Sequence, residues 1–277
     1  MSRIFLREQI IKLITKKEKG REKMRREFGL VSIIMAAYNA ENTIKDAVNS
    51  VLNQTYGNWE LLVIDDCSCD ETYNIVQEIS NKDQRVRLVK NDVNKGVSYS
   101  RKRAAEEAKG QWIAILDSDD MWASQKLEKQ IELQQEQKAD LLYTGSIFVD
   151  TNGELIDWYL HAPKTMTYKQ LLKQNLISNS SALVKKELYL KLYASGDKMH
   201  EDFATWLRIL KTGVVAYGVD EPLLIYRLDK SSKSGNKVVA AKMNWNTYRY
   251  IGLNIFQSFY YEVWYVIKGL LKYRNLK

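Results

Sequence analysis

Acidic side chains follow two apolar runs of the sequence. Asp65 and Asp66 come after Leu61-Leu62-Val63-Ile64, and Asp117-Ser118-Asp119-Asp120 comes after Trp112-Ile113-Ala114-Ile115-Leu116. One acidic pair after a strand is often only a helix cap or a turn former. Two such clusters at one edge repel unless a cation or a hydrogen-bond donor offsets their charge. The second run suits Mg²⁺ or Mn²⁺, hard ions held by a few carboxylates and by phosphate oxygens. The residues therefore predict a metal site for a phosphorylated ligand.

The elements that position these acids alternate between strand and helix from Leu30 onward. Apolar strands are predicted at 31–35, 61–64, 86–89 and 112–116, and helices at 42–52, 71–79, 98–108 and after Ser124 as N-cap. This alternation predicts a mostly parallel α/β sheet with helices on both faces. Ligands of such sheets bind beyond the carboxyl ends of the strands, where the acids lie.

After Asp140 the pattern changes. A hairpin is predicted at 141–159 around Thr151-Asn152-Gly153, followed by a helix from Tyr168, a strand at 182–184 and a helix at 201–211. We predict a basic helical extension at 1–29, a catalytic domain at 30–235 and an amphipathic basic tail at 236–277. The domain would divide into a nucleotide half, about 30–120, and an acceptor half, about 121–235.

The sequence has no glycine-rich phosphate loop. It contains neither Gly-x-Gly-x-x-Gly after the first strand nor Gly-Lys-Ser/Thr, which argues against a dinucleotide-binding or P-loop protein. A diphosphate must then be neutralised by metal and by side chains. Asn94-Lys95-Gly96, followed by Arg101 and Arg103, offers cationic groups, and a solvated helix face is the alternative interpretation of the two arginines.

Basic charge gathers at the two ends of the chain. Residues 1–30 hold ten Lys and Arg against four Glu, and residues 237–277 hold seven against one, while the middle is acidic overall. This distribution argues against a nucleic-acid partner, whose binding fold would itself be basic. It favours a catalytic unit with ends that lie on an anionic membrane surface. We expect no secretory signal or transmembrane span, and Cys67 and Cys69 are expected to be reduced, as in a cytosolic enzyme.

Six segments resemble the motifs of family 2 glycosyltransferases, in the family's order. They are residues 31–41, 60–70, 94–101, 116–122, 200–208 and 222–234. The resemblance implies a GT-A fold, with a Rossmann-like sheet flanked by helices, and transfer with inversion of a hexose or N-acetylhexosamine. It further implies a nucleotide diphosphate sugar, a UDP-sugar, as donor and a lipid-linked oligosaccharide of bacterial surface polysaccharide as acceptor. The enzyme would be peripheral on the cytoplasmic face of the cell membrane.

The resemblance also assigns residues. Asp65, together with Asp66, would bind the base and ribose of the nucleotide. The nucleotide-binding set would be Ala37, Tyr38, Asn39, Glu41, Asp65, Asp66, Lys95, Gly96, Arg101, Asp117 and Ser118. Asp117 and Asp119 would form the metal motif, with Asp119 the direct ligand of Mn²⁺ or Mg²⁺. Asp202 would be the general base: its position alone favours an acid at a helix N-terminus, and the order of the motifs favours catalysis.

Some residues depart from the family pattern. Ala36, Cys67 and Lys102 stand where the family has proline, glycine and asparagine. Asp229 replaces a histidine, which removes a histidine contact to metal or diphosphate; its carboxylate is an alternative metal contact. The roles of Asp229 and His200 stay open.

Two other functions are compatible with the acidic clusters. A nucleotidyltransferase also joins metal-binding aspartates to a nucleotide, but it predicts a basic or glycine-rich loop after the first strand. An inactive membrane-bound scaffold would not need Asp117, Asp119 and Asp202.

The tail repeats apolar and aromatic residues at helical spacing. They include Ile255, Phe256, Phe259, Tyr260, Val263, Trp264, Ile267, Leu270 and Leu271, followed by Lys272 and Arg274. Basic charge beside Trp and Tyr favours a helix in the membrane interface. A helix packed on the core or in a homo-oligomer interface is the alternative.

Overall fold

A computed structural model describes residues 28–196, 198–228 and 237–272. The predicted extension at 1–29 therefore falls almost wholly outside the described residues, and so does Asp229.

The described strands form one mixed sheet. Their bounds are β1 (Val31–Ala37), β2 (Trp59–Asp65), β3 (Val86–Lys90), β4 (Trp112–Ile115), β5 (Met121–Trp122), β6 (Leu141–Val149), β7 (Leu155–Leu160), β8 (Thr165–Met166), β9 (Leu183–Lys185) and β10 (Ala216–Arg227). The strand order is β3-β2-β1-β4-β9-β6-β10-β5, with β7 beside β6 and β8 beside β10. Strands β1 to β4 are parallel. Strand β9 is antiparallel to both β4 and β6, which makes β6 run in the same direction as β4.

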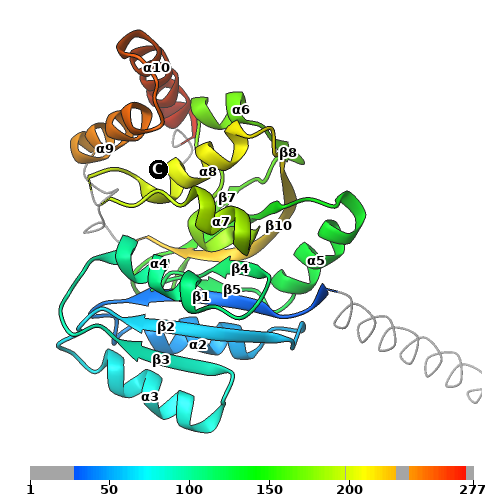
Figure 1. Cartoon of the computed structure of the whole chain (residues 1–277), viewed down its shortest axis with the longest axis vertical. Coiled ribbons are helices and arrows are strands. Elements are labelled where there is room, and N and C mark those ends of the chain that lie inside the picture. The colour runs from blue at the N-terminus through cyan, green and yellow to red at the C-terminus, as the bar shows by residue number, and fades with distance from the viewer. Residues whose placement is uncertain (1–27, 197, 229–236, 273–277) are drawn as a thin grey trace, which may run out of the picture.

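Helices cover both faces of this sheet (Figure 1). Their bounds are α2 (Ile44–Leu52), α3 (Thr72–Lys82), α4 (Val97–Glu107), α5 (Lys126–Gln137), α6 (Tyr168–Lys173), α7 (Lys186–Leu192), α8 (Glu201–Lys211), α9 (Lys237–Tyr250) and α10 (Ile255–Lys272), with a 3-10 turn at Asn179–Ser181. Side chains alternate across each strand, so successive residues enter different cores. Leu61 and Val63 pack with α2, α3 and α5, whereas Leu62 and Ile64 pack with α4, α6, α7 and α8.

The strands and helices predicted for the nucleotide half are confirmed, with shifts of one to three residues at their ends. The hairpin of β6 and β7 is also confirmed, and α8 has the predicted bounds. Ser124 is not the N-cap of α5, because the helix begins one residue later and Gln125 holds the cap position. The acceptor half contains α7 and the long strand β10, which the sequence patterns did not predict.

The two tail helices pack differently. Helix α9 buries Tyr248 in the core that contains α8, and the Tyr248 hydroxyl donates a hydrogen bond to the Leu172 carbonyl at 2.6 Å. Helix α10 lies over α6 and α9 but leaves one face exposed. The core thus continues past residue 236. In the described ranges no helix is long and apolar enough to cross a membrane.

Candidate active site

The predicted acids lie at one edge of the sheet. Parallel strands β1, β2 and β4 end there, and β6 and β10 run in the same direction and end beside them. Asp65 ends β2, Asp117 follows β4, and Arg227 ends β10. The sheet topology therefore brings residues from both halves to the same edge (Figure 1).

Asp65 and Asp66 are both buried but have different partners. Asp66 accepts hydrogen bonds from the Asn91 side chain at 2.6 Å and from the backbone N–H groups of Lys95 and Gly96 at 2.9 and 2.8 Å. Asp65 Oδ2 accepts a hydrogen bond from the Ser68 backbone at 3.2 Å, whereas its Oδ1 is buried without a protein partner. Asp66 thus holds the loop after β3, and Asp65 keeps one acceptor oxygen without a protein partner, which is uncommon for a buried polar atom.

The loop after β1 is hydrogen-bonded to the loop after β2. The Asn39 side chain accepts a hydrogen bond from the Cys69 backbone at 2.9 Å, and Glu41 accepts one from the Glu71 backbone at 3.1 Å. Tyr38, which directly precedes Asn39, is half exposed, at 50%. Asn39 and Glu41 therefore shape the edge of the site, while the Tyr38 ring is free to stack on a flat ligand.

Residues Asp117 to Asp120 form a crowded acidic turn after β4. The Asp120 side chain accepts a hydrogen bond from the Arg227 backbone at 3.0 Å. Burial, then the charges of Asp119 and Asp117, raise the pKa of Asp120 well above its ordinary value. Loss of hydration and the charge of Asp117 raise the pKa of Asp119 to about 6, although part of Asp119 faces solvent. Ser118 is half-buried between these acids.

Asp202 lies in the first turn of α8, within electrostatic range of the acidic turn. Burial raises the pKa of Tyr226 on β10, and the charges of Asp120, Asp117, Asp119 and Asp202 raise it further. All four carboxylates therefore lie within electrostatic range of one phenol. The predicted base and the predicted metal motif, more than 80 residues apart in sequence, meet in one site.

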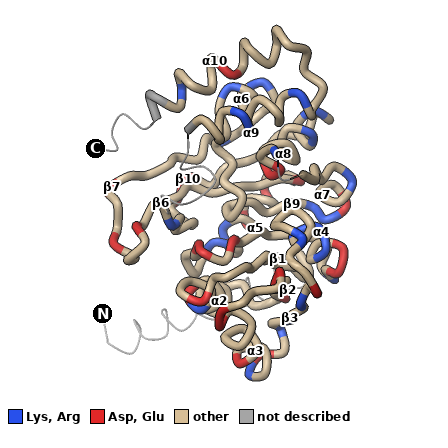
Figure 2. The backbone as a smooth tube through the Cα atoms, turned by 90° about the vertical axis from the view of Figure 1, so that its left-hand side faces the viewer, with Lys and Arg blue, Asp and Glu red and all other residues tan. Residues whose placement is uncertain are grey.

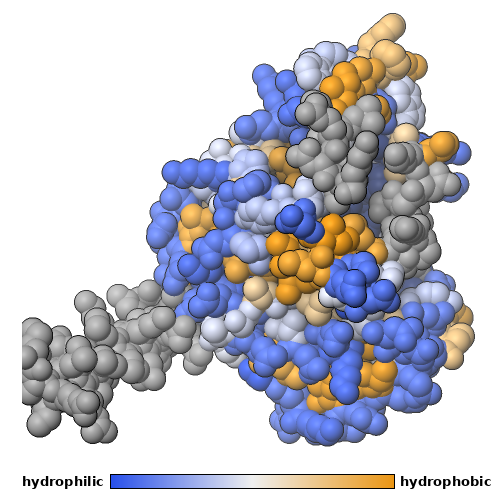
Figure 3. All heavy atoms as spheres, turned by 180° about the vertical axis from the view of Figure 1, so that it is seen from behind, coloured by the Kyte–Doolittle hydropathy of each residue, from blue (hydrophilic) through white to orange (hydrophobic). Residues whose placement is uncertain are grey.

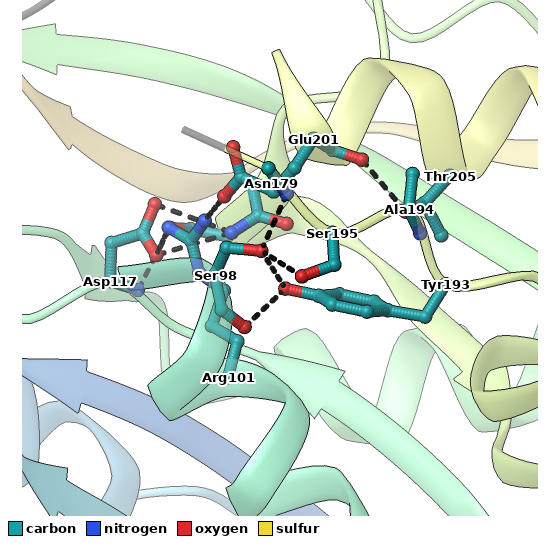
Figure 4. A network of polar contacts seen from close by, with 11 residues as sticks. Ser98, Arg101, Asp117, Asn179, Tyr193, Ala194, Ser195, Glu201 and Thr205 are labelled. Carbon is teal, nitrogen blue, oxygen red and sulfur yellow. Dashed lines mark hydrogen bonds and ion pairs between the residues drawn. The ribbon is translucent and has the colours of Figure 1, made fainter. Parts of the chain in front are cut away.

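Arg101 links these two groups of acids (Figure 4). Its guanidinium donates hydrogen bonds to Asp117 from one terminal nitrogen and to Glu201 from the other, and the residue is only 8% exposed. Burial opposes its charge, but Asp117 and Glu201 hold the pKa of Arg101 well above its ordinary value. In this arrangement two carboxylates share Arg101. That Arg101 contacts the diphosphate of the donor stays a prediction.

A divalent cation fits the acidic turn only in part. Among the described residues no three His, Cys, Asp or Glu side chains form a group that could hold a metal ion. Asp117 and Asp119 nevertheless supply hard oxygen ligands, and their mutual repulsion, visible in the raised pKa of Asp119, is a charge that a cation would offset. Two carboxylates are a sufficient protein share when phosphate oxygens complete the coordination shell.

Several residues of the site were not singled out from the sequence. They are Asn91, which contacts Asp66; Asn179, whose amide donates to Asp117 at 3.1 Å; Ser180, which accepts from the Asp117 backbone at 3.0 Å; and Arg227, whose Nε donates to the Asp119 carbonyl at 3.1 Å. Arg227 lies in the segment at 222–234 that resembles a family motif, directly after its apolar residues, and this position is a signal that could have identified it. Asn179 and Ser180 lie in a 3-10 turn without a sequence signal.

Comparisons with known proteins agree with this geometry. The sequence model of the family described as Glycosyl transferase family 2 matches residues 32–189. TuaG of Bacillus subtilis (strain 168), assigned to teichuronic acid biosynthesis, is 40% identical over 222 residues, which are 80% of this chain and 88% of TuaG. The Escherichia coli UDP-Glc:alpha-D-GlcNAc-diphosphoundecaprenol beta-1,3-glucosyltransferase WfgD is 38% identical over 245 residues, 88% of this chain and 95% of WfgD. The crystal structure of residues 1–349 of S. aureus TarS in complex with UDP-GlcNAc has a TM-score of 0.69 and 18% identity, and the match covers 88% of this chain and 74% of that TarS fragment. The last likeness confirms the expected fold.

Proposed function

This chain belongs to glycosyl transferase family 2 and is a glycosyltransferase, and from that premise we propose that it moves a hexose or N-acetylhexosamine from a UDP-sugar to a lipid-linked oligosaccharide. The observation that carries the proposal is the meeting of Asp65, the acidic turn and Asp202 at one edge of the sheet. The named activity of WfgD supports a UDP-sugar donor and an undecaprenyl-diphosphate-linked acceptor.

The donor would bind between the loops after β1, β2 and β4. The buried Asp65 Oδ1 would accept a hydrogen bond from an N–H group of the base, because it has no protein partner. Tyr38 would stack on the base with its exposed ring. Asp117 and Asp119 would hold Mn²⁺ or Mg²⁺ against the diphosphate. An ion bound there would offset the charge that the leaving nucleoside diphosphate gains.

The acceptor would approach from α8. Asp202 would take the proton of the acceptor hydroxyl while the hydroxyl oxygen forms a bond to the anomeric carbon. The bond from that carbon to the diphosphate oxygen would break in the same step, and its electron pair would leave with the nucleoside diphosphate. A single displacement from the opposite side inverts the anomeric centre.

The lipid-linked acceptor requires the enzyme to work at a membrane, and α10 offers a surface for it. Its outer face exposes Ile255, Phe256, Phe259, Tyr260, Val263, Trp264, Val266 and Ile267. Figure 3 shows this hydrophobic surface at the upper end of the molecule, and Figure 2 shows Lys and Arg on the neighbouring α6 and α9. Apolar and aromatic residues beside basic ones fit the interface of an anionic bilayer. We place the enzyme on the inner face of the cell membrane.

Asp202→Asn tests the proposed reaction. With UDP-glucose or UDP-GlcNAc, Mn²⁺ and a GlcNAc-diphospholipid acceptor, transfer should fall by about 10²–10⁴-fold, the scale of losing a general base. UDP binding measured by calorimetry should be unchanged, because Asp202 acts on the acceptor. Asp157→Asn on the exposed part of β7 is the control and should keep both properties. Near-normal transfer by folded Asp202→Asn protein would place the base elsewhere.

A further inference from the structure

The ion pairs of Arg101 join the donor side of the site to the residue beside the proposed base (Figure 4). We propose that Arg101 and Glu201 are positioning residues for the transfer step: they fix the first turn of α8, and with it Asp202, relative to Asp117. This inference rests on the proposed function, in which Asp202 is the base.

The geometry of the pair is rigid. A guanidinium is planar and donates from both terminal nitrogens in fixed directions. Arg101 comes from α4, Asp117 follows β4, and Glu201 begins α8. One side chain therefore sets the separation of two carboxylates that lie on different elements. Arg101 and Glu201 are each only 8% exposed, so water does not compete strongly for these bonds.

The start of α8 depends on such tethers. His200 occupies its N-cap but makes no side-chain cap hydrogen bond. The His200 backbone N–H donates to Thr247 Oγ1 at 3.1 Å, and the Ala194 N–H donates to Thr205 Oγ1 at 2.9 Å. These two bonds tie α8 to α9 and to the preceding loop. The Arg101 pair ties it to the donor side.

Glu201 must be ionised to do this, because a carboxylate makes a charge-assisted hydrogen bond to the guanidinium. Burial raises the pKa of Glu201 above its ordinary value, with Asp202 adding to the shift and Arg101 opposing it. A neutral group at position 201 would leave Arg101 with Asp117 as its remaining ionised partner in the network. The first turn of α8 would then lose its charge-assisted bond to the donor side, and Asp202 would be less well placed. A displacement of about 1 Å at a reacting group can cost about 100-fold in rate.

Glu201→Gln is the first test, because it keeps the shape and removes the charge. Transfer to the lipid-linked acceptor at saturating donor should fall by about 10- to 100-fold. UDP affinity and hydrolysis of the donor by water should change little. Hydrogen exchange of the first turn of α8, where the Ala204 N–H donates to the His200 carbonyl at 2.9 Å, should become faster.

Arg101→Lys should lose transfer as well, since one ammonium cannot bridge two carboxylates as a guanidinium does. The double variant should be no worse than Arg101→Lys, as expected of coupled residues.

Glu60→Gln is the matched control. Glu60 is also buried and pairs with an arginine, Arg87, at 3.2 Å, but it lies near the start of β2, at the opposite end of the strand from Asp65. The Glu60→Gln substitution should lower the melting temperature without changing the ratio of transfer to hydrolysis or the hydrogen exchange of α8.

If Glu201→Gln lowers transfer and hydrolysis equally, as a loss of folded protein would, the Arg101–Glu201 pair is only structural and the inference fails. Unchanged exchange and transfer would overturn it as well. An inactive wild-type enzyme would instead contradict the proposed function, and exchange would still report on the pair.

Discussion

Asp65 and Asp66 are neighbours in sequence, but their carboxylates meet different groups. Asp66 accepts three hydrogen bonds from the loop after β3, and Asp65 keeps one buried oxygen without a protein partner. At the scale of single residues, Asp66 makes contacts that hold a loop, whereas Asp65 has an acceptor oxygen without a protein partner. Substitutions at the two positions should therefore affect different measurements.

Asp65→Ala should weaken UDP binding by tenfold or more, because a charged hydrogen bond contributes about 1.5–3 kcal/mol. It should destabilise the protein less than Asp66→Asn, because Asp65 accepts one protein hydrogen bond, from Ser68, and Asp66 accepts three. Asp66→Asn should do the reverse, since its amide NH₂ would face either the N–H donor of Gly96 or the donors of Asn91 and Lys95. It should cost about 2–3 kcal/mol of the free energy of unfolding. Calorimetry with UDP and thermal unfolding would separate the two. Equal effects of both substitutions on UDP affinity would contradict this division.

Asp119 predicts a pH dependence. Its pKa is raised from 3.8 to about 6 in the folded protein. The folded state then holds this proton more tightly than the unfolded state, so Asp119 lowers the free energy of unfolding as pH rises from about 4 to 6. Asp119→Asn should remove that loss and raise the melting temperature at pH 7 by about 2–4 °C, which corresponds to about 1 kcal/mol after discounting for solvent exposure.

The same substitution should abolish the response to metal. In wild-type protein, Mn²⁺ should strengthen UDP binding above about pH 6 and lose this effect below it, because the ligand must be ionised. In Asp119→Asn protein Mn²⁺ should have little effect at any pH. A wild-type Mn²⁺ response in that variant would remove Asp119 from the metal motif.

At the scale of elements, α9 and α10 form one tail in sequence but two different surfaces in the fold. Tyr248 of α9 is buried in the core, whereas Phe256 and Phe259 of α10 are 86% and 64% exposed. On its other side α10 contacts the protein through Tyr261 and Tyr265, whose rings lie against Tyr248 and Phe203. The outer face can therefore be altered without opening the core.

Replacing Phe256 and Phe259 by Gln should reduce binding to anionic vesicles at least 100-fold, because burying each ring in lipid contributes about 1.5–3 kcal/mol. Cosedimentation with phosphatidylglycerol vesicles at low and high salt would measure it, and neutral vesicles should bind the wild type less. Leu155→Gln, at an apolar residue that is 68% exposed on β7, is the control and should bind normally. A dimer that these Phe substitutions dissociate, with vesicle binding unchanged, would favour the oligomer interface.

At the scale of the whole molecule, α9 completes the hydrophobic core of the acceptor half. Tyr248 packs against Phe203 of α8 and reaches Leu172 of α6 through its hydroxyl. Tyr248→Ala should therefore cost about 3–5 kcal/mol, the range for deleting a large buried aromatic side chain. Chemical denaturation would measure it, with Tyr260→Ala on the exposed face of α10 as the control. Equal stability of the two variants would mean that the tail is separate from the core.

The sequence by itself determined the nucleotide half of the fold. Its strands alternate with helices, and the hydrophobic periodicity that distinguishes the two is a property of each short segment. It can therefore be recognised without knowledge of how the elements pack. For the same reason β6, β7 and α8 were predictable. The short strands β5 and β8 and the long β10 were not, since their pairing depends on partners far away in sequence. The acidic runs also predicted Asp65, Asp66, Asp117 and Asp119 as candidate site residues, because strand ends are visible in the chain.

Only the tertiary structure decided what each of those residues contacts. It separated Asp65 from Asp66, buried Arg101 between Asp117 and Glu201, and brought Arg227 to the acidic turn. It also divided the tail into a core helix and an exposed one. The physical reason is that partners, burial and electrostatic environment come from residues up to 108 positions away, on elements whose register is set by the packing of the whole sheet.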